Sequence, residues 1–151
     1  MDLDDIDKAV LNRIQSDFPV HPHPFRVIAQ ELGLTESQVV ARTRRLKAAG
    51  IIRRIGGNFA PHKVGFVSTL CAARVPEARI DQFAAVVNQF SGVTHNYLRD
   101  NAVFNVWFTF IARSMAEIET HLSRIRDETG VETIMNLPAT RVFKIKAQFD
   151  L

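Results

Sequence analysis

The sequence predicts an α+β protein in which an N-terminal winged helix-turn-helix domain is followed by a ferredoxin-like βαββαβ domain. Apolar residues recur at helical spacing in three segments of the first 50 residues. From residue 65 onward, strand and helix patterns alternate in the order βαββαβ. A Gly-Gly pair at residues 56 and 57 separates the two regions. We therefore expect two domains, residues 1–57 and residues 58–151.

The N-terminal region carries the signals of three helices and a wing. Apolar residues share one helical face over residues 4–16, and the proline-rich segment VHPHP ends that pattern. A short helix is predicted over residues 25–32, with Gly33 as its stop. A capping box at Thr35-Glu-Ser-Gln38 opens a third helix that runs to Ala49. The next stretch, IIRRIGG, predicts a strand and turn that form the wing.

The C-terminal region alternates between strand and helix signals. An apolar stripe predicts a helix over residues 78–90, and a second capping box at Ser114-Met-Ala-Glu117 opens a helix that ends at Gly130. Asp100-Asn101 is a turn signal, so the strands on either side of it form a hairpin. The predicted strands cover residues 65–75, 93–99, 103–112 and 131–137, and a terminal extension adds a fifth strand over residues 140–149.

Composition limits the class of protein. The chain has 151 residues, of which 46% are hydrophobic and 23% charged, as is typical of a folded globular protein. No apolar run approaches the ~20 residues that cross a bilayer, and the acidic start MDLDDIDKAV differs from a secretory signal. We expect a cytoplasmic protein that does not bind membranes. We interpret the single cysteine, Cys71, as a small buried residue, and His21 and His23 lack the further ligands of a metal site.

A basic stretch coincides with the third predicted helix. It holds six cations and no acid: Arg42, Arg44, Arg45, Lys47, Arg53 and Arg54. Because the third helix of a helix-turn-helix enters the major groove, these cations are candidates for DNA binding. The alternative is a solvated helix face beside a dimer contact, since the formal net charge is only +3. The residues alone leave both open.

A second constellation lies on the predicted hairpin, HNYLRDNAVFNVWFTF. Strand alternation allows six side chains to share one face: His95, Tyr97, Arg99, Asn105, Trp107 and Thr109. Such a face suits a large, flat, anionic ligand, because the indole would stack on it and the guanidinium would pair with a carboxylate. The alternative is a polar dimer interface.

The chain resembles the Lrp/AsnC family of transcription regulators over nearly its full length, through LTESQVVARTRRLKAAGIIRR and the link APHKVGF. Within that family, HNYLR, FNVWFT and GIIRRIGGNFAPHKVGF resemble the siroheme decarboxylases of alternative haem and haem d1 biosynthesis. The resemblance implies a carboxy-lyase that removes the C12 and C18 acetate carboxyl groups of siroheme to give 12,18-didecarboxysiroheme. It implies no cofactor for the chemistry, and a related subunit as heterodimer partner or a homo-oligomer. Whether the chain works alone, and whether it also binds haem, stays open.

The same resemblance suggests roles for individual side chains. His95 is expected to deliver the proton that completes the reaction, with Tyr97 as a second candidate donor. Arg99, with Arg53 and Arg54, would grip substrate carboxylates. The remaining expected substrate-binding residues are His62, a lesser candidate for acid or iron ligand, and Asn105 and Trp107.

The alternative function is an Lrp/AsnC-type DNA-binding regulator that senses a small molecule or a tetrapyrrole. We expect the helix-turn-helix to serve as a scaffold instead, because the basic stretch is short and FPVHPHPF departs from the pattern of the regulators.

Overall fold

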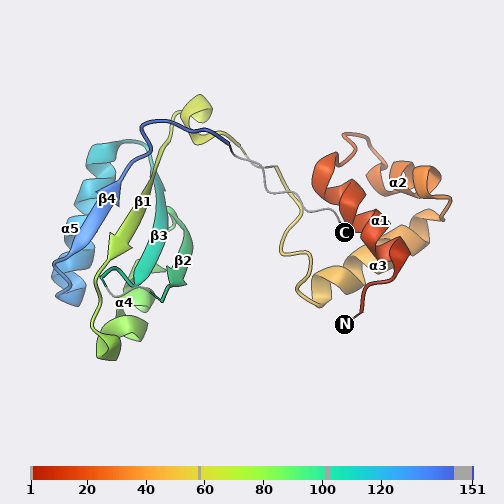
Figure 1. Cartoon of the computed structure of the whole chain (residues 1–151). Coiled ribbons are helices and arrows are strands. Elements are labelled where there is room, and N and C mark those ends of the chain that lie inside the picture. Colours follow the sequence, from red (N-terminus) through yellow and green to blue (C-terminus); the bar gives the residue numbers. More distant parts are fainter. Residues whose placement is uncertain (1, 58, 101–102, 145–150) are drawn as a thin grey trace. The chain divides into compact units, whose positions relative to one another are not determined.

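A computed structural model of the chain describes residues 2–57, 59–100, 103–144 and 151. The chain divides into two compact units, a helical unit over Met1–Gly57 and a sheet unit over Asn58–Phe143 (Figure 1). Leu151 belongs with the helical unit, where its carbonyl oxygen accepts a hydrogen bond from Asn12 Nδ2 at 3.5 Å. Within the part of the chain that the structure describes, no helix is long and apolar enough to cross a membrane.

The helical unit contains the three predicted helices, α1 (Asp5–Ser16), α2 (Pro24–Leu32) and α3 (Glu36–Ala48). The capping box that opens α3 is confirmed, because the Thr35 hydroxyl accepts from the Gln38 N–H while the Gln38 side chain accepts from the Thr35 N–H. The helices pack around fully buried side chains: Val10, Ile28, Val39 and Leu46.

The predicted wing strand is wrong. Residues 51–57, all of which the structure describes, contain no strand. The backbone instead turns back on the end of α3, where the Leu46 carbonyl oxygen accepts from the N–H groups of Ile51 and Ile52. Ile52 is 7% exposed and packs beside Leu46 and Leu11. Closing the free carbonyl of the helix end and burying Ile52 takes the place of strand pairing.

The sheet unit is the predicted ferredoxin-like βαββαβ arrangement. Its strands are β1 (Val67–Ala73), β2 (Val93–Leu98), β3 (Val106–Ala112) and β4 (Ile134–Leu137), in the spatial order β2-β3-β1-β4. Every neighbouring pair is antiparallel. Short 3-10 helices, η1 (Pro61–Val64) and η2 (Glu77–Arg79), precede β1 and α4. Residues 140–144 form no strand, and the rest of the strand predicted over 140–149 lies outside the described residues.

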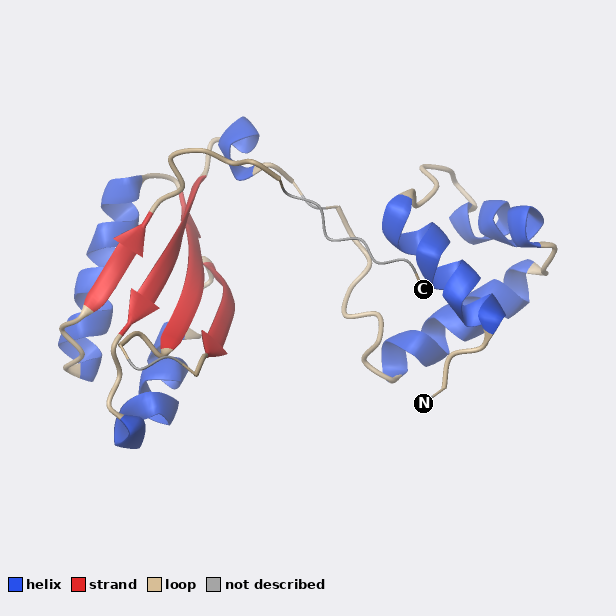
Figure 2. Cartoon of the chain, viewed as in Figure 1, coloured by secondary structure: helices blue, strands red, loops and turns tan. Residues whose placement is uncertain are grey.

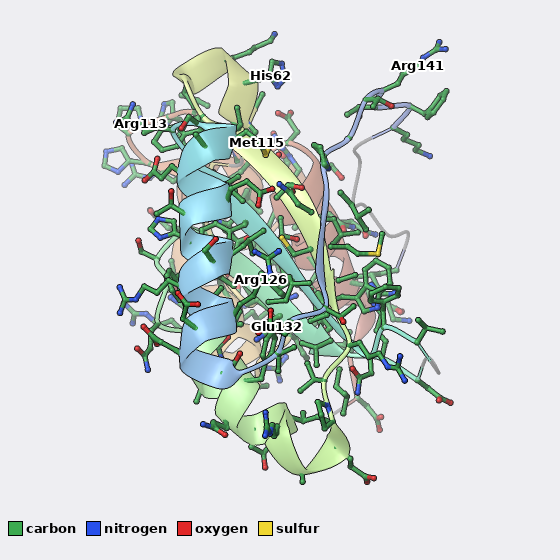
Figure 3. All side chains as sticks on the ribbon, turned by 90° about the vertical axis from the view of Figure 1, so that its left-hand side faces the viewer. His62, Arg113, Met115, Arg126, Glu132 and Arg141 are labelled. Carbon is green, nitrogen blue, oxygen red and sulfur yellow. The ribbon has the colours of Figure 1, made fainter. Side chains whose placement is uncertain are left out.

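Two helices, α4 (Ile80–Val87) and α5 (Met115–Thr129), cover one face of this sheet (Figures 2 and 3). Phe83 of α4 and Leu122 of α5 are fully buried against Phe108 and Phe110 of β3. Cys71 of β1 lies in the same core, fully buried, and burial raises the pKa of its thiol to about 12. The interpretation of Cys71 as a small buried residue is confirmed. With both helices on one side, no helix within the described residues of the sheet unit covers its second face.

The end of β3 and the start of α5 differ in one detail from the predicted capping box. The Ser114 hydroxyl accepts from the Glu117 N–H at 3.1 Å, as expected of an N-cap. The Glu117 carboxylate, however, accepts from the N–H of Arg113, one residue earlier than a capping box requires. The helix start is therefore closed by a Ser114 cap and a carboxylate that reaches one residue further back.

Candidate functional site

The sheet face without helices carries two rows of side chains that run across all four strands. Strand register sets the first row as His95, Thr109, Leu70 and Leu137, and the second as Tyr97, Trp107, Ala72 and Met135. We call these eight residues, together with Arg99 beside the Trp107 ring, the open face. Each row crosses three inter-strand spacings, about 14 Å. The β2 side of the open face is polar and proton-bearing, whereas the β1 and β4 side is apolar.

The predicted hairpin register is confirmed by the pairing of His95 with Thr109 and of Tyr97 with Trp107. Arg99 continues the series beyond the strand, because its N–H donates to the Asn105 carbonyl oxygen at 2.7 Å. The hairpin therefore brings His95, Tyr97, Trp107 and Thr109 to a common face, with Arg99 beside Trp107.

A β-bulge at Thr94 makes this arrangement possible. Val93 pairs with Phe110 and packs against the core, yet His95, two residues later, pairs with Thr109 on the opposite face. Strict alternation would put Val93 and His95 on the same face. Thr94 is the extra residue that shifts the register and re-aims every side chain after it. The sequence carries a signal of this bulge. Strict alternation would place the apolar Val93 on the same face as the polar residues His95, Tyr97 and Arg99.

His95 has two close neighbours on its own strand. Its Nδ1 lies 3.1 Å from the Thr94 hydroxyl oxygen, within hydrogen-bond distance. Its ring stacks beside that of Tyr97, with centroids 5.9 Å apart and planes inclined by 24°. Both side chains are exposed, and Tyr97 retains 45% of its accessible surface. Two groups that can donate protons thus lie side by side, where a ligand on the open face can reach them.

Trp107 and Arg99 form a second pair. The Trp107 indole N–H donates to the Phe104 carbonyl oxygen at 2.8 Å, which fixes the ring plane. The Arg99 guanidinium carbon lies 5.7 Å from the indole centroid, at cation–π distance. The ring is half-buried and Arg99 is exposed, so the pair offers an aromatic surface with a positive charge at its edge.

The Asn105 side chain is engaged by the backbone. Its Oδ1 accepts from the Val75 N–H at 2.9 Å, and its Nδ2 donates to the Val75 carbonyl oxygen at 2.8 Å. The amide thereby ties the end of β1 to the segment before β3. Since the Asn105 carbonyl oxygen also receives the Arg99 N–H, this residue supports the hairpin where Arg99 leaves it. Its predicted contact with substrate stays a prediction.

The other predicted site residues lie elsewhere. His62 is exposed on η1, at the end of the sheet unit where Met115 begins α5 (Figure 3). Arg53 and Arg54 are exposed in the helical unit, so the geometry of the open face does not include them. Their expected roles stay predictions. Across the described ranges, no group of three or more His, Cys, Asp or Glu side chains is placed to hold a metal ion.

The basic residues of α3 separate into two sets. Arg42 forms ion pairs with Asp4 and Asp7 of the α1 region, and Arg45 also pairs with Asp7, whose side chain is 1% exposed. The hydrogen bond from Arg42 holds the pKa of the Asp4 carboxyl below its ordinary value of 3.8. The other four cations of the stretch, Arg44, Lys47, Arg53 and Arg54, have no acid within ion-pair distance among the residues described. Two of the six candidate DNA-binding cations are therefore used inside the helical unit.

Comparison with known proteins decides the family. Two family profiles match the chain, a "Siroheme decarboxylase NirDL-like HTH domain" over residues 7–53 and an "AsnC-like ligand binding domain" over residues 63–144. The siroheme decarboxylase alpha subunit of Oleidesulfovibrio alaskensis is 51% identical over 150 residues, which cover 99% of this chain and 90% of that protein. The chain belongs to the siroheme decarboxylase family.

Other members of the siroheme decarboxylase family differ in length. The NirDL subunit of Paracoccus denitrificans is 41% identical across 100% of this chain, which spans 46% of that protein. A crystal structure of the siroheme decarboxylase NirDL superposes with a TM-score of 0.67 at 31% identity, over 96% of this chain and 47% of that one. A second NirDL structure was solved in co-complex with an iron-uroporphyrin III analogue. An AsnC family transcriptional regulator from Agrobacterium tumefaciens shares the fold, with a TM-score of 0.77 at 18% identity over 97% of this chain and 96% of that one.

Proposed function

We propose that this chain is a siroheme decarboxylase subunit, a carboxy-lyase that removes the C12 and C18 acetate carboxyl groups of siroheme. The product is 12,18-didecarboxysiroheme, an intermediate for haem or haem d1. The observation that supports this reaction most directly is the open face, which sets a His-Tyr pair and an Arg-Trp pair side by side on one hairpin.

The chemistry needs little beyond orientation and one proton per carboxyl group. When the bond between the acetate methylene and its carboxylate breaks, CO2 leaves and the electron pair stays on the methylene carbon. The conjugated macrocycle can delocalise that charge. A proton then forms the new C–H bond and completes a methyl group. His95 is the donor in this proposal, and the adjacent Tyr97 is the alternative donor.

The two halves of the open face match the two parts of this substrate. The apolar side, with Leu70 and Met135 each 40% exposed, would lie against the macrocycle, and Trp107 would stack on it. Arg99, at the polar end, would pair with a carboxylate through charge-assisted hydrogen bonds. A flat molecule with acidic groups at its rim is thereby oriented with its acetates toward β2.

Arg53 and Arg54 would bind further carboxylates, and His62 would serve as the lesser acid or as an iron ligand. Relatives of this chain carry the names alpha, NirD and NirG subunit. We therefore propose a related subunit as partner, with a homo-oligomer as the alternative. No separate cofactor is required for the chemistry in this proposal, because the substrate itself accepts the electron pair.

The direct test is to incubate the purified protein with siroheme under anaerobic conditions, alone and with each related subunit, and to follow the mass of the tetrapyrrole. We expect a loss of two CO2 units. Siroheme that stays unchanged with every combination of subunits would refute the proposed activity.

A further inference from the structure

We propose that Thr94 is a positioning residue for His95: its hydroxyl holds Nδ1 of the imidazole, so that Nε2 is the atom that carries the exchangeable proton. The observation is the 3.1 Å distance between the Thr94 Oγ1 and His95 Nδ1 atoms. The inference rests on the proposed role of His95 as proton donor, and it adds a residue that this role depends on.

The bulge explains why two consecutive residues of a strand can interact in this way. In a regular strand, the side chains of residues 94 and 95 would point to opposite faces. The register shift between Val93 and His95 breaks that alternation at Thr94. Bulges occur beside active sites, where they re-aim a side chain. Here the extra residue both turns His95 to the open face and brings a hydroxyl to its ring.

A hydroxyl suits this position because it can donate and accept. In the resting neutral ring that we propose, the Thr94 O–H donates to Nδ1 and the ring proton resides on Nε2. When the ring is protonated, Nδ1–H donates to the Thr94 oxygen. The protonated ring can then give its Nε2 proton to the carbon that has lost CO2, which leaves its other proton on Nδ1 as a donor to the Thr94 oxygen. Water then protonates Nε2 again, and loss of the Nδ1 proton to water returns the ring to its resting Nε2–H form. Nδ1 keeps a partner in both states.

The groups around His95 leave this task to Thr94. Tyr97 stacks on the ring from the same strand, and Thr109, which is uncharged, is paired with His95 on β3. Arg99 lies at the far end of the strand, where it approaches Trp107. Of these neighbours, Thr94 is the one whose hydroxyl lies within hydrogen-bond distance of a ring nitrogen of His95.

The test compares Thr94→Val, which removes the hydroxyl at nearly constant shape, with Thr94→Ser, which keeps it. Thr120→Val, on the exposed surface of α5, is the matched control, since the Thr120 hydroxyl donates to the Ala116 carbonyl oxygen of its own helix. Nitrogen-15 NMR of the imidazoles in the full chain without substrate reports the tautomer, with His95→Gln identifying the His95 signals. Turnover of siroheme by the competent assembly is measured alongside.

We expect His95 to be the Nε2–H tautomer in the native protein and a mixture in Thr94→Val. We expect kcat to fall by up to about tenfold in Thr94→Val, the worth of one hydrogen bond, with KM unchanged. Thr94→Ser should restore both readouts, and Thr120→Val should change neither. A tautomer that is unchanged in Thr94→Val overturns the inference. A changed tautomer with native turnover instead refutes the proposed role of His95. Thr94→Ala replaces Thr94→Val if the latter unfolds.

Discussion

Individual side chains on and beside the open face divide into those that are exposed to a ligand and those that hold their neighbours in place. His95, Tyr97 and Arg99 are exposed; the rings of His95 and Tyr97 stack, and Arg99 lies over the Trp107 ring. Asn105, by contrast, uses both polar atoms of its amide on the Val75 backbone. Substitutions of the first kind should change reaction or binding, whereas Asn105→Ala should first loosen the hairpin.

His95→Ala and Arg99→Ala should differ in kind. If His95 donates the proton, His95→Ala keeps tetrapyrrole binding and loses turnover by roughly 10²–10⁴-fold. Arg99→Ala should weaken binding by roughly tenfold to a hundredfold, because a substrate carboxylate loses its charged partner. Binding is measured by absorbance titration and turnover by product mass. Leu98→Ala is the control, since Leu98 lies on β2 and is 62% exposed. Native turnover of His95→Ala in the active subunit would assign the proton to Tyr97, His62 or water.

Gly92 should not tolerate a side chain. A Cβ atom built on it would lie 2.2 Å from the Ile111 carbonyl oxygen and 2.9 Å from the Phe110 ring. The Gly92 carbonyl oxygen also accepts from the Ile111 N–H at 2.8 Å, so β2 and β3 cannot separate freely there. We expect Gly92→Ala to lower the free energy of unfolding by about 1–3 kcal/mol. Gly56→Ala, with open space around its Cβ, is the control. Equal thermal stability of the two variants would contradict this packing.

At the scale of elements, the acidic start of α1 holds the basic face of α3. Asp4 is the N-cap of α1 and, together with Asp7, completes its capping box, while both carboxylates also receive Arg42. The first and third helices are therefore linked by charge as well as by the buried side chains between them.

The ion pairs of the helical unit predict that its stability falls in acid. The pKa of Asp4 is lower when folded than its ordinary 3.8, because of the hydrogen bond from Arg42, and the pKa of Glu31 is lowered from 4.5 by the hydrogen bond from Arg13. Their contribution to stability is present above those ordinary values and is lost as pH falls through the lower, folded values. Urea unfolding at several pH values measures it. The stability difference between native protein and Asp4→Asn should be constant near neutral pH and shrink in acid. A difference that grows in acid would reverse the assigned sign.

The helix-turn-helix should not bind DNA specifically. Arg42 and Arg45 are held by acids of the same unit, which reduces the charge that α3 can offer to phosphates. Footprinting of the upstream DNA of its own gene, at nanomolar protein and moderate salt, should show no protected site. A salt-sensitive, sequence-specific footprint would favour the regulator function instead.

The sequence predicts which helices and strands exist better than it predicts where strands end and in which register they pair. Apolar periodicity and caps locate α1, α2, α3 and α5, because those patterns reflect the faces that these helices bury. The prediction of a wing strand was wrong because Ile52 packs in the core beside Leu46. The alternation of residues around Ile52 does not reveal this tertiary contact. The bulge at Thr94 was missed for a related reason. The apolar Val93 alternates with polar residues, which indicates an irregularity, but where the extra residue lies depends on how the strand pairs with β3.

At the scale of the whole molecule, the open face needs a cover. Apolar side chains of β1 and β4 lie beside the polar hairpin with no helix of the sheet unit over them. We expect the chain to pair across a two-fold or pseudo-two-fold axis, with itself or with a related subunit. Light scattering at micromolar concentration, with and without each related subunit, measures this. An active monomer would contradict the prediction.

Cys71 gives the whole chain an internal reporter. In the folded sheet its thiol is out of contact with water and, with a pKa raised to about 12, stays protonated at neutral pH. An alkylating reagent can therefore label it only while the core between the sheet and its two helices is open. Because the sequence holds no second cysteine, each labelled molecule records one opening of the sheet. At reagent concentrations where alkylation is faster than reclosing, the rate of labelling is the rate at which the core beneath the open face opens, and no second cysteine has to be introduced.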